Sequence, residues 1–481
     1  MLAGSRPDCQ FPCAQNSRWP APEERPCSNG HTRCHKLCRK YVIFVTRTFL
    51  CYASPLLWLA AWITLALSPQ RSLGLYLGCL SAAWLGFWGT WRSTVFLSGK
   101  SPVVWLWSGA IAARLIGWLA APVFENDWAR FLWDGWLICQ GKDPWQSVPM
   151  DWFAVASVPE TMRGVLDQIN HPGLHTVYGP AAQAGFALAA WIAPGSLLVL
   201  KAVFLAADCA IIALLQRAAG AQRAILYAWC PLVIQETSFS AHPDVMAIAL
   251  MLAAWLGQRH RVASGFCLAL ALACRPHAML LAPFLLWRTG WRGGLGLLSG
   301  LIICYAPCVW LGHWAEWSTL SQMAGDWRFN DILRSGFALV MEEPAVRWTS
   351  QLLFAIGAGL VFAHWWRQKA VPFPALGFLY GWWWLCSPVA NAWYLQFAVP
   401  FLVLSTAAAQ SIWSRAGQRL TWALLLTAPL TYVTGLQIQN GSSAWELAPW
   451  VMPVEAAVCL GAVLTTKWHR LSSFQYNDTM I

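Results

Sequence analysis

The sequence predicts an all-α integral membrane protein, a polytopic helical bundle of about 11 to 14 transmembrane helices. Hydrophobic residues make up 58% of the 481 residues and charged residues only 11%, whereas soluble domains carry about one quarter charged residues. Apolar stretches recur along the chain near the length of about 20 residues that a helix needs to cross the hydrocarbon core. Short clusters of Arg and Lys separate them.

The apolar stretches fall into two groups by length. Those of suitable length for a span are residues 49–67, 73–91, 103–123, 197–215, 295–311, 352–366, 373–386, 394–406, 420–435 and 450–466. Shorter apolar segments, which leave the helix number open, are residues 224–234, 245–255, 263–274 and 278–287. The third stretch is followed by a long polar connection, which we expect to be a large extracytoplasmic loop.

Basic and acidic residues occupy different connections, and this separation predicts the orientation. Basic clusters are Arg92 with Lys100, Arg217 with Arg223, Arg259 with Arg261, Arg288 with Arg292, Arg367 with Lys369, Arg415 with Arg419, and Lys467 with Arg470. Because Lys and Arg in short loops stay in the cytoplasm, the acidic connections 125–167, 236–244 and 316–343 and Glu446 are expected outside. We therefore expect a multi-pass protein of the cell inner membrane with both termini cytoplasmic.

Residues 178–217 do not fit this alternation simply. They contain two apolar segments, split at Pro194, although the predicted sides of Tyr178 and Arg217 require an odd number of crossings. We therefore expect the first segment to be re-entrant or interfacial. The net charge of +11 is explained by anionic lipid headgroups and requires no nucleic acid.

The chain divides into three parts by composition. Residues 1–40 form a polar cytoplasmic tail, residues 41–470 the polytopic membrane domain, and residues 471–481 a short cytoplasmic tail. A zinc site at His31, Cys34, His35 and Cys38 is one interpretation of the first tail, although the spacing matches no strong ligand pattern. The alternatives are a disordered extension or a start codon assigned too early.

Polar motifs gather in the connections expected outside. The first is residues 125–135, where three acids and an arginine follow a predicted span. Later connections add further acids, histidines, arginines and aromatics at residues 141–145, 169–180, 240–244, 275–277, 326–331 and 387–394. We therefore expect these residue types to converge on one face of the membrane.

These motifs, taken in order, resemble those of the bacterial polyprenol-phosphate-mannose-dependent mannosyltransferases of the GT-C superfamily. The resemblance spans residues 125–394, and the combination is more specific than any single motif. Its elements are Asp-x-x-Arg-Phe-x-Trp-Asp-Gly from Asp127, Gly-x-Asp-Pro-Trp from Gly141, Asn-x-Pro from Asn170, Thr-x-Tyr-x-Pro from Thr176, Ala-His-x-Asp from Ala241, Trp-x-Phe-Asn from Trp327 and Ser-Pro-x-x-x-x-Trp-Tyr from Ser387.

The resemblance implies a hexosyltransferase with a polyprenyl-phosphate sugar donor, an extracytoplasmic site and a catalytic Asp, which maps to Asp127. The sugar expected is mannose, and the acceptor is the hydroxyl of a lipid or glycan. The sequence departs from the family at Asp143, Gly179 and Asn391, where Asn, Pro and His are usual. These departures concern the sugar and the acceptor more than the reaction class.

The chemistry of such a transfer requires these residue types. A carboxylate within about 3 Å of the acceptor hydroxyl can take its proton as the hydroxyl attacks the anomeric carbon, and Asp127 is the candidate base. The leaving phosphate needs cations or hydrogen-bond donors rather than an acid; Arg130, Arg275, His242 and His277 are the candidates. An inverting single displacement is the simplest mechanism, because nothing in the sequence fixes the carboxyl pair about 5 Å apart that retaining glycosidases need.

Further substrate-binding candidates come from the same motifs: Asp134, His171, Tyr178, Asp244, Trp327, Asn330 and Trp393. A structural role for Asp134 and a surface ion pair between Asp127 and Arg130 are the alternative interpretations. The tryptophans close enough to the motifs to stack on a sugar are Trp128, Trp133, Trp145, Trp327 and Trp393. We expect no cofactor and no metal, since His171 and His175 flank Pro172 and cannot lie one helical turn apart.

The competing class is a polytopic transporter or flippase for a sugar or a lipid-linked sugar. Transporters place functional polar residues near the bilayer midplane and often contain internal repeats, whereas here the polar motifs lie on one face and no repeat of fixed period is present. A membrane scaffold would not require so many converging acids and histidines. The expected partners are therefore the lipid-phosphate donor, the acceptor and membrane lipids.

Overall fold

The structure, a computed structural model, describes residues 51–68, 71–94, 99–310, 319–322, 325, 327–368, 373–405, 412–439 and 446–466. Within these ranges the chain is helical, and the extended pairing there is a single parallel bridge between Phe329 and Val389. The predicted all-α class is confirmed for this part of the protein. The two predicted tails, residues 1–40 and 471–481, and Asp326 lie outside it.

A first described helix, Cys51–Leu67, precedes the others. The longer helices that follow are α2 (Leu73–Ser93), α3 (Ser101–Leu119), α4 (Trp128–Cys139), α6 (Pro180–Ile192), α7 (Leu197–Ala219), α8 (Ala221–Ala228), α10 (Asp244–Leu256), α11 (Arg261–Cys274), α12 (Ala282–Trp310), α15 (Glu343–Gln368), α16 (Phe373–Cys386), α18 (Ile412–Thr427) and α20 (Val451–Leu464). Shorter helical turns are η2 (Pro149–Trp152), α5 (Glu160–Leu166), α9 (Pro231–Ile234), η3 (Gln235–Phe239), η4 (Pro276–Leu281), α14 (Ile332–Phe337), η5 (Ala392–Ala398), α17 (Val399–Leu404), η6 (Ala428–Tyr432) and α19 (Val433–Gln439).

Five helices of the described chain are long and apolar enough to cross a membrane. They are Leu73–Ser93, Ser101–Leu119, Leu197–Ala219, Pro276–Trp310 and Glu343–Arg367. A sixth span arises if Pro231–Phe239 and Asp244–Leu256, which meet at 119°, are taken together as one broken helix. Shorter apolar helices are Cys51–Leu67, Arg261–Cys274, Ala392–Leu404 and Val451–Leu464.

The ambiguous stretches resolve into short or interrupted helices. The first apolar segment after Tyr178 becomes α6, which at 13 residues spans only about 20 Å, too short to cross. The second becomes α7, with 23 residues. Helix α12 is interrupted at Gly290, where φ is 63° and ψ is −157°, so the basic pair Arg288 and Arg292 flanks a break between two helical segments.

A buried ion pair explains one acid that lies inside an apolar stretch. Asp208 on α7 accepts a 2.7 Å hydrogen bond from Nε of Arg114 on α3 and a 2.8 Å bond from the hydroxyl of Tyr227 on α8. Arg114 also donates to the carbonyl of Ala228. Because removing one member of a buried pair leaves an uncompensated charge and costs about 3–5 kcal/mol, this group holds three helices together.

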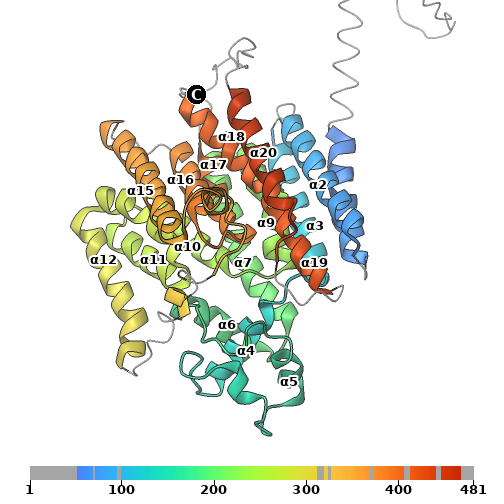
Figure 1. Ribbon diagram of the computed structural model, residues 1–481, viewed down its shortest axis with the longest axis vertical. Helices are drawn as coiled ribbons and strands as arrows, with labels where there is room; N and C mark the ends of the chain where they lie inside the picture. The colour runs from blue at the N-terminus through green and yellow to red at the C-terminus, as the bar shows by residue number, and fades with distance from the viewer. Residues whose placement is uncertain are drawn as a thin grey trace, which may run out of the picture. The chain divides into compact units, whose positions relative to one another are not determined.

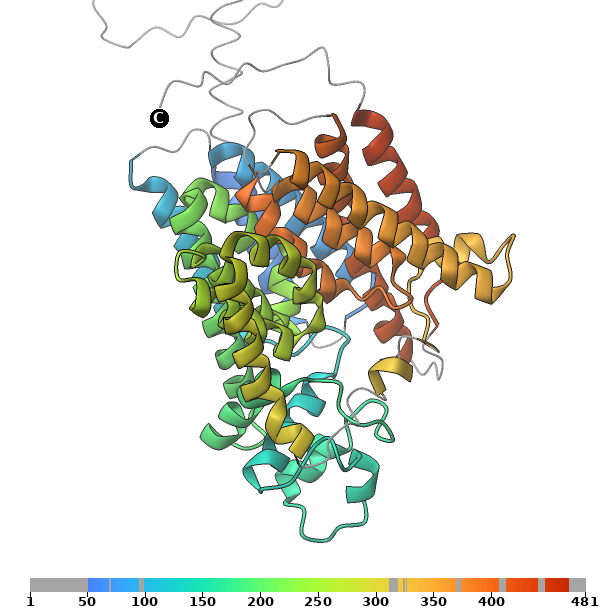
Figure 2. The same ribbon diagram turned by 90° about the vertical axis from the view of Figure 1, so that its left-hand side faces the viewer.

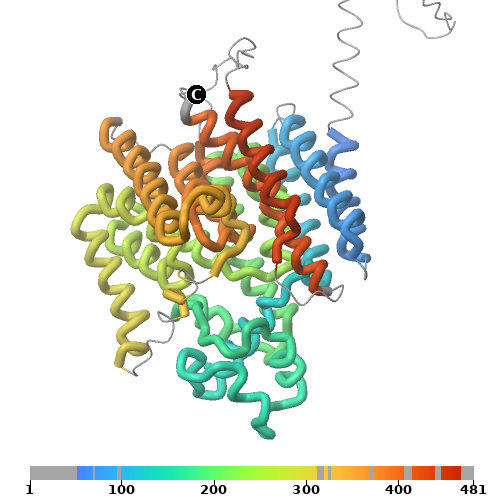
Figure 3. The backbone as a smooth tube through the Cα atoms, viewed as in Figure 1, coloured from blue at the N-terminus to red at the C-terminus, as the bar shows by residue number. Residues whose placement is uncertain are grey.

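The connection after α3 is an ordered helical segment rather than an open loop. Residues 124–179 contain α4, η2 and α5, and α4 packs closely against α6. Together α4, α5 and α6 lie at one end of the helical part of the chain in both ribbon views (Figures 1 and 2). The tube in Figure 3 shows the chain between α4 and α6 folding back on itself there. The polar motifs of residues 125–180 are therefore carried on a folded platform.

Labelling from the two sides of the membrane tests the orientation. Single cysteines placed beside Asp143 and beside Trp327 should react with a membrane-impermeant maleimide in intact cells. A cysteine beside Arg259 should react only after the membrane is opened, because that connection carries the basic residues. The reverse pattern would place the polar platform in the cytoplasm.

Candidate functional site

A cavity of about 430 Å³ brings together motifs that are far apart in the sequence. Its walls come from the connection after α3, the turn between α11 and η4, the segment around the Phe329–Val389 bridge, and the η5 and η6 regions. The polar and aromatic residues that line it are Phe124, Glu125, Asp127, Arg130, Asn170, His171, His175, Thr176, Tyr178, Arg275, Thr319, Trp327, Arg328, Phe329, Asn391, Trp393, Tyr394, Thr431, Tyr432 and Thr434.

Two carboxylates stand together on one wall. Asp127 is the N-cap residue of α4, yet its side chain makes no capping hydrogen bond to the helix. Glu125 turns back on its own backbone, and its Oε1 accepts hydrogen bonds of 2.9 Å from the amides of Asn126 and Asp127. Both side chains line the cavity, so a substrate hydroxyl can approach the Asp127 carboxylate directly.

The surroundings of Glu125 favour its protonated form. Burial raises the pKa of Glu125 well above its ordinary value, and the negative charge and hydrogen bonding of Asp127 raise that pKa further. The backbone hydrogen bonds from Asn126 and Asp127 oppose the shift in the pKa without cancelling it. A carboxyl group with a raised pKa beside a second carboxyl group in a cavity is typical of functional sites.

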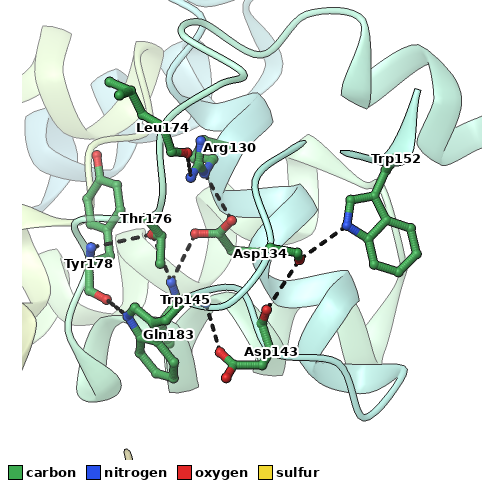
Figure 4. A network of polar contacts seen from close by, with 10 residues as sticks. Arg130, Asp134, Asp143, Trp145, Trp152, Leu174, Thr176, Tyr178 and Gln183 are labelled. Atoms are coloured by element: carbon green, nitrogen blue, oxygen red, sulfur yellow. Dashed lines mark hydrogen bonds and ion pairs between the residues drawn. The ribbon is translucent and has the colours of Figure 1, made fainter. Parts of the chain in front are cut away.

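Arg130 lies on the same wall and is fixed from behind. Its Nε donates to Asp134 at 3.1 Å and its Nη2 donates to the carbonyl of Leu174 at 2.7 Å (Figure 4). Asp134 is buried and also accepts a 2.9 Å bond from Gln183 on α6. Burial raises the pKa of Asp134, and the charge of Arg130 opposes this. Asp134 thus orients Arg130 and joins α4 to α6 rather than facing the cavity.

Arg275 provides a buried cation on the opposite wall. It lies in extended backbone between α11 and η4, with φ −148° and ψ 127°, the conformation that the ring of the following Pro276 favours. Its Nη2 is 3.0 Å from Asp244 at the start of α10, and its guanidinium lies 4.6 Å from the Tyr178 ring centre. A Cβ at Gly179 would meet the Ala273 carbonyl at 2.3 Å, so only glycine allows this close approach of Tyr178 to Arg275.

A broken helix supplies a buried polar layer behind the cavity wall that Trp393 and Tyr432 form. The π-helical turn η3 contains Glu236, and the chain then bends before α10, with Ala241 at φ 61°. Glu236 Oε2 accepts a 2.5 Å bond from the Tyr432 hydroxyl and lies 3.1 Å from His242 Nδ1. The His242 ring stacks on Trp393 at 4.1 Å between ring centres. Tyr432 and Trp393 carry this layer to the cavity surface.

Strained backbone is concentrated around the cavity. Among the residues that the structure describes, four non-glycine residues have positive φ: Phe124, His171, Ala241 and Asn330. Phe124 and His171 line the cavity, Ala241 precedes His242, and Asn330 follows the lining residue Phe329. Each such conformation costs about 1–3 kcal/mol and is typical of ligand-binding sites. This clustering supports the cavity as the functional site independently of its residue types.

The predicted site residues separate into two layers. Seven line the cavity: Asp127, Arg130, His171, Tyr178, Arg275, Trp327 and Trp393. Five are buried or half-buried in the layer behind the lining: Asp134, His242, Asp244, His277 and Asn330. His277 packs against the rings of Trp383 and Tyr394, and Asp244 pairs with Arg275. The structure therefore brings seven of the predicted residues to one cavity and places five behind its lining, and their roles stay predictions.

Stacking candidates divide in the same way. Trp327 lies 4.7 Å from His171 between ring centres, and with Trp393 it lines the cavity. Trp133 is fully buried against Trp152, which excludes a sugar from its ring. The indole of Trp145 donates to the Tyr178 carbonyl at 3.1 Å and supports the platform. Trp128 does not line the cavity.

Three contributors to the site escaped sequence reasoning. Glu125 was placed outside the motif, Glu236 carried no assigned role, and Tyr432 lies in an apolar stretch. A signal did exist for Glu236, since an acid within an apolar segment usually faces a cavity or a partner. Tyr432 had none, because its partner is 196 positions away in the chain.

Comparison of the chain with protein-family models, curated proteins and solved structures gives no match.

The raised pKa of Glu125 predicts an alkaline limb in any pH–rate profile of this site. Below that pKa Glu125 is neutral, and as the pH rises through it a second negative charge develops beside Asp127 and repels an anionic substrate. In Glu125→Gln this limb should be lost, while the rate on the acid side of the Glu125 pKa changes by less than about tenfold. Rates measured from pH 6 to pH 10 check this, and an alkaline limb unchanged in the variant would contradict it.

Proposed function

We propose that the protein is a glycosyltransferase that moves a hexose, mannose by resemblance, from a polyprenyl-phosphate donor to an acceptor hydroxyl on the extracytoplasmic face. The observation that carries this proposal is the position of Arg275, a buried cation between a polar cavity and an apolar one. The acceptor is a lipid or a glycan. The resemblance of residues 125–394 to GT-C mannosyltransferases supports the same reaction.

The apolar cavity lies directly behind Arg275. It has a volume of about 640 Å³ and is lined by residues of α11, η4 and α12, among them Leu272, Met279, Leu301 and Ile302. Cys274 and Pro276, the chain neighbours of Arg275, belong to its lining, as does Gly179 beside Tyr178. A ligand with an anionic head and a long hydrocarbon chain suits this arrangement, because the phosphate binds Arg275 while the chain leaves water.

The charges around the polar cavity favour a singly charged phosphodiester. Each arginine that lines it already has a carboxylate partner: Arg130 has Asp134, Arg275 has Asp244, and Arg328 has Asp331 at 2.6 Å. A diphosphate or a nucleotide donor would bring more than one negative charge next to Glu125 and Asp127, although each arginine of the described lining already shares its charge with a carboxylate. A polyprenyl monophosphate sugar brings one negative charge.

The proposed reaction is a single displacement. The acceptor oxygen attacks the anomeric carbon, the bond from that carbon to the phosphate oxygen breaks, and Asp127 takes the hydroxyl proton. Arg275 stabilises the negative charge that grows on the leaving phosphate. Glu125, whose pKa burial raises well above its ordinary value, adds no charge beside Asp127 while it is protonated. Because the acceptor oxygen attacks on the side opposite the leaving phosphate, the anomeric configuration is inverted.

A transporter or flippase is the second candidate, and the broken helix at residues 231–256 favours it. Discontinuous helices form the substrate sites of many secondary transporters. Uptake of free mannose or of a fluorescent polyprenyl-phosphate mannose into proteoliposomes, without transfer to an acceptor, would support this candidate. Turnover of radiolabelled polyprenyl-phosphate mannose into a glycosylated product by the purified protein would support the transferase.

Replacing Asp127 tests the base. Asp127→Asn keeps the shape of the side chain but removes the proton acceptor, so the single-turnover rate should fall by about 100-fold or more while donor affinity and thermal stability change little. Asp151→Asn is the matched control, since Asp151 lies on the same connection and bonds only to the Val148 amide in η2. A near-normal rate in Asp127→Asn would remove the base assignment.

Replacing Arg275 tests the phosphate site. Arg275→Gln should weaken binding of polyprenyl-phosphate mannose by about tenfold or more, since a charge-assisted hydrogen bond contributes about 1.5–3 kcal/mol. The donor affinity of Arg275→Lys should lie between those of the unmodified protein and Arg275→Gln, because an ammonium contacts the phosphate as a point charge rather than through a fork of two N–H groups. Equilibrium binding to the purified variants measures this, and unchanged affinity in Arg275→Gln would separate Arg275 from the donor.

A further inference from the structure

Glu236 and His242 form a pair with no exposed surface on either side chain, although an acid and an imidazole are costly to bury. Their partners at the cavity are Tyr432 and Trp393. Apolar side chains of similar size would fill this space at lower cost. The cost of burying this pair indicates a functional role. Its contacts with Tyr432 and Trp393 indicate that the role concerns these two cavity residues.

The hydroxyl group of Tyr432 donates its hydrogen bond to Glu236. A phenol carries one O–H donor, and in Tyr432 it is used in the 2.5 Å bond to Glu236 Oε2. What the oxygen retains for a ligand is its capacity to accept. Tyr432 is thus held as an acceptor, and the group it can recognise must donate a hydrogen bond, as a sugar hydroxyl does.

Trp393 has one ring face covered. The His242 ring lies against that face at 4.1 Å with an angle of 17° between the planes, while Trp393 is only half-buried and lines the cavity. The remaining surface of the indole is a flat apolar area, which the C–H face of a hexose can cover. His242 fixes the ring in place from behind.

Trp393 is separated from Arg275, the proposed phosphate-binding residue, by the ring of Tyr394. Its ring centre is 5.7 Å from that of Tyr394, and the Tyr394 ring centre is 5.9 Å from the Arg275 guanidinium. A sugar bonded directly to a phosphate at Arg275 would therefore lie within reach of the Trp393 ring. An acceptor, which is not attached to the phosphate, has no such constraint.

We propose that Trp393 and Tyr432 form the subsite for the sugar of the donor, and that Glu236 and His242 are positioning residues for it. The inference rests on the proposed lipid-phosphate donor at Arg275. Glu236 sets Tyr432 as a hydrogen-bond acceptor, and His242 sets the plane of Trp393. The buried pair on the broken helix thereby gives the cavity its preference for a hydroxyl-bearing ring.

Two probes separate sugar recognition from lipid-phosphate recognition. Farnesyl phosphate carries the phosphate and the chain, and farnesyl-phosphate mannose adds the sugar. The ratio of their dissociation constants, measured on the purified full-length protein in detergent, reports the sugar subsite alone. Tyr432→Phe should reduce this ratio about fivefold, Trp393→Leu about tenfold, and neither should change the dissociation constant of farnesyl phosphate by more than about twofold.

Control variants distinguish positioning from general damage. Glu236→Gln should keep the ratio, because the amide oxygen still accepts from Tyr432, whereas Glu236→Leu should lower it as Tyr432→Phe does. Tyr380→Phe is the matched control, since the Tyr380 hydroxyl is buried against the Met251 sulfur and does not line the cavity. That variant should bind both probes normally.

The outcomes discriminate between the two proposals. Normal farnesyl phosphate binding with an unchanged ratio in both Tyr432→Phe and Trp393→Leu overturns the sugar subsite and leaves the donor site standing. Failure of the unmodified protein to bind farnesyl phosphate overturns the donor site and the subsite with it. Should Glu236→Leu fail to fold, the two cavity variants still decide.

Discussion

The ion pair between Arg275 and Asp244 is the interaction on which the site depends. It joins the end of α11 to the first residue of α10, two elements separated by a sharp bend of the chain, and both partners are buried. The guanidinium also lies against Tyr178 and near Tyr394, so it connects the platform after α3 with the η5 segment. Removing either charge would leave the other uncompensated in an environment where water cannot replace it.

The rest of the site is arranged so that polar groups at the cavity have partners in a second layer. Asp134 holds Arg130, Asp244 holds Arg275, and Glu236 holds Tyr432. This arrangement has a physical reason. Long side chains lose much conformational freedom on binding, and a group that is already fixed loses less when a ligand arrives. The buried layer thus preorganises the cavity.

The irregular backbone serves the same purpose. A helix that passed straight through residues 231–256 would satisfy its own amides and present one face to the cavity. The π-helical turn and the bend after it instead place Glu236 and His242 against each other, within reach of Tyr432 and Trp393. The irregular backbone there is tolerated because Glu236 and His242 are buried within the protein.

Some of this could be predicted from the chain alone, because it follows from local composition and spacing. Apolar stretches of sufficient length determine helices, and α2 and α7 coincide closely with the predicted residues 73–91 and 197–215. The motif residues Asp127, Arg130, Tyr178, Arg275 and Trp393 also meet in one cavity, as expected. The helices follow from the sequence because periodicity is a property of neighbouring residues, and the motif residues could be grouped through their resemblance to a family pattern.

What only the tertiary structure decided is which side chain faces the cavity and which stands behind it. Asp134 and His242 carry the same motif signal as Asp127, yet contacts with Gln183 and Trp393 turn them inward. Tyr432 enters the site through Glu236, 196 positions away. Such pairings depend on how helices pack across the whole unit, and the local pattern of residues does not specify them.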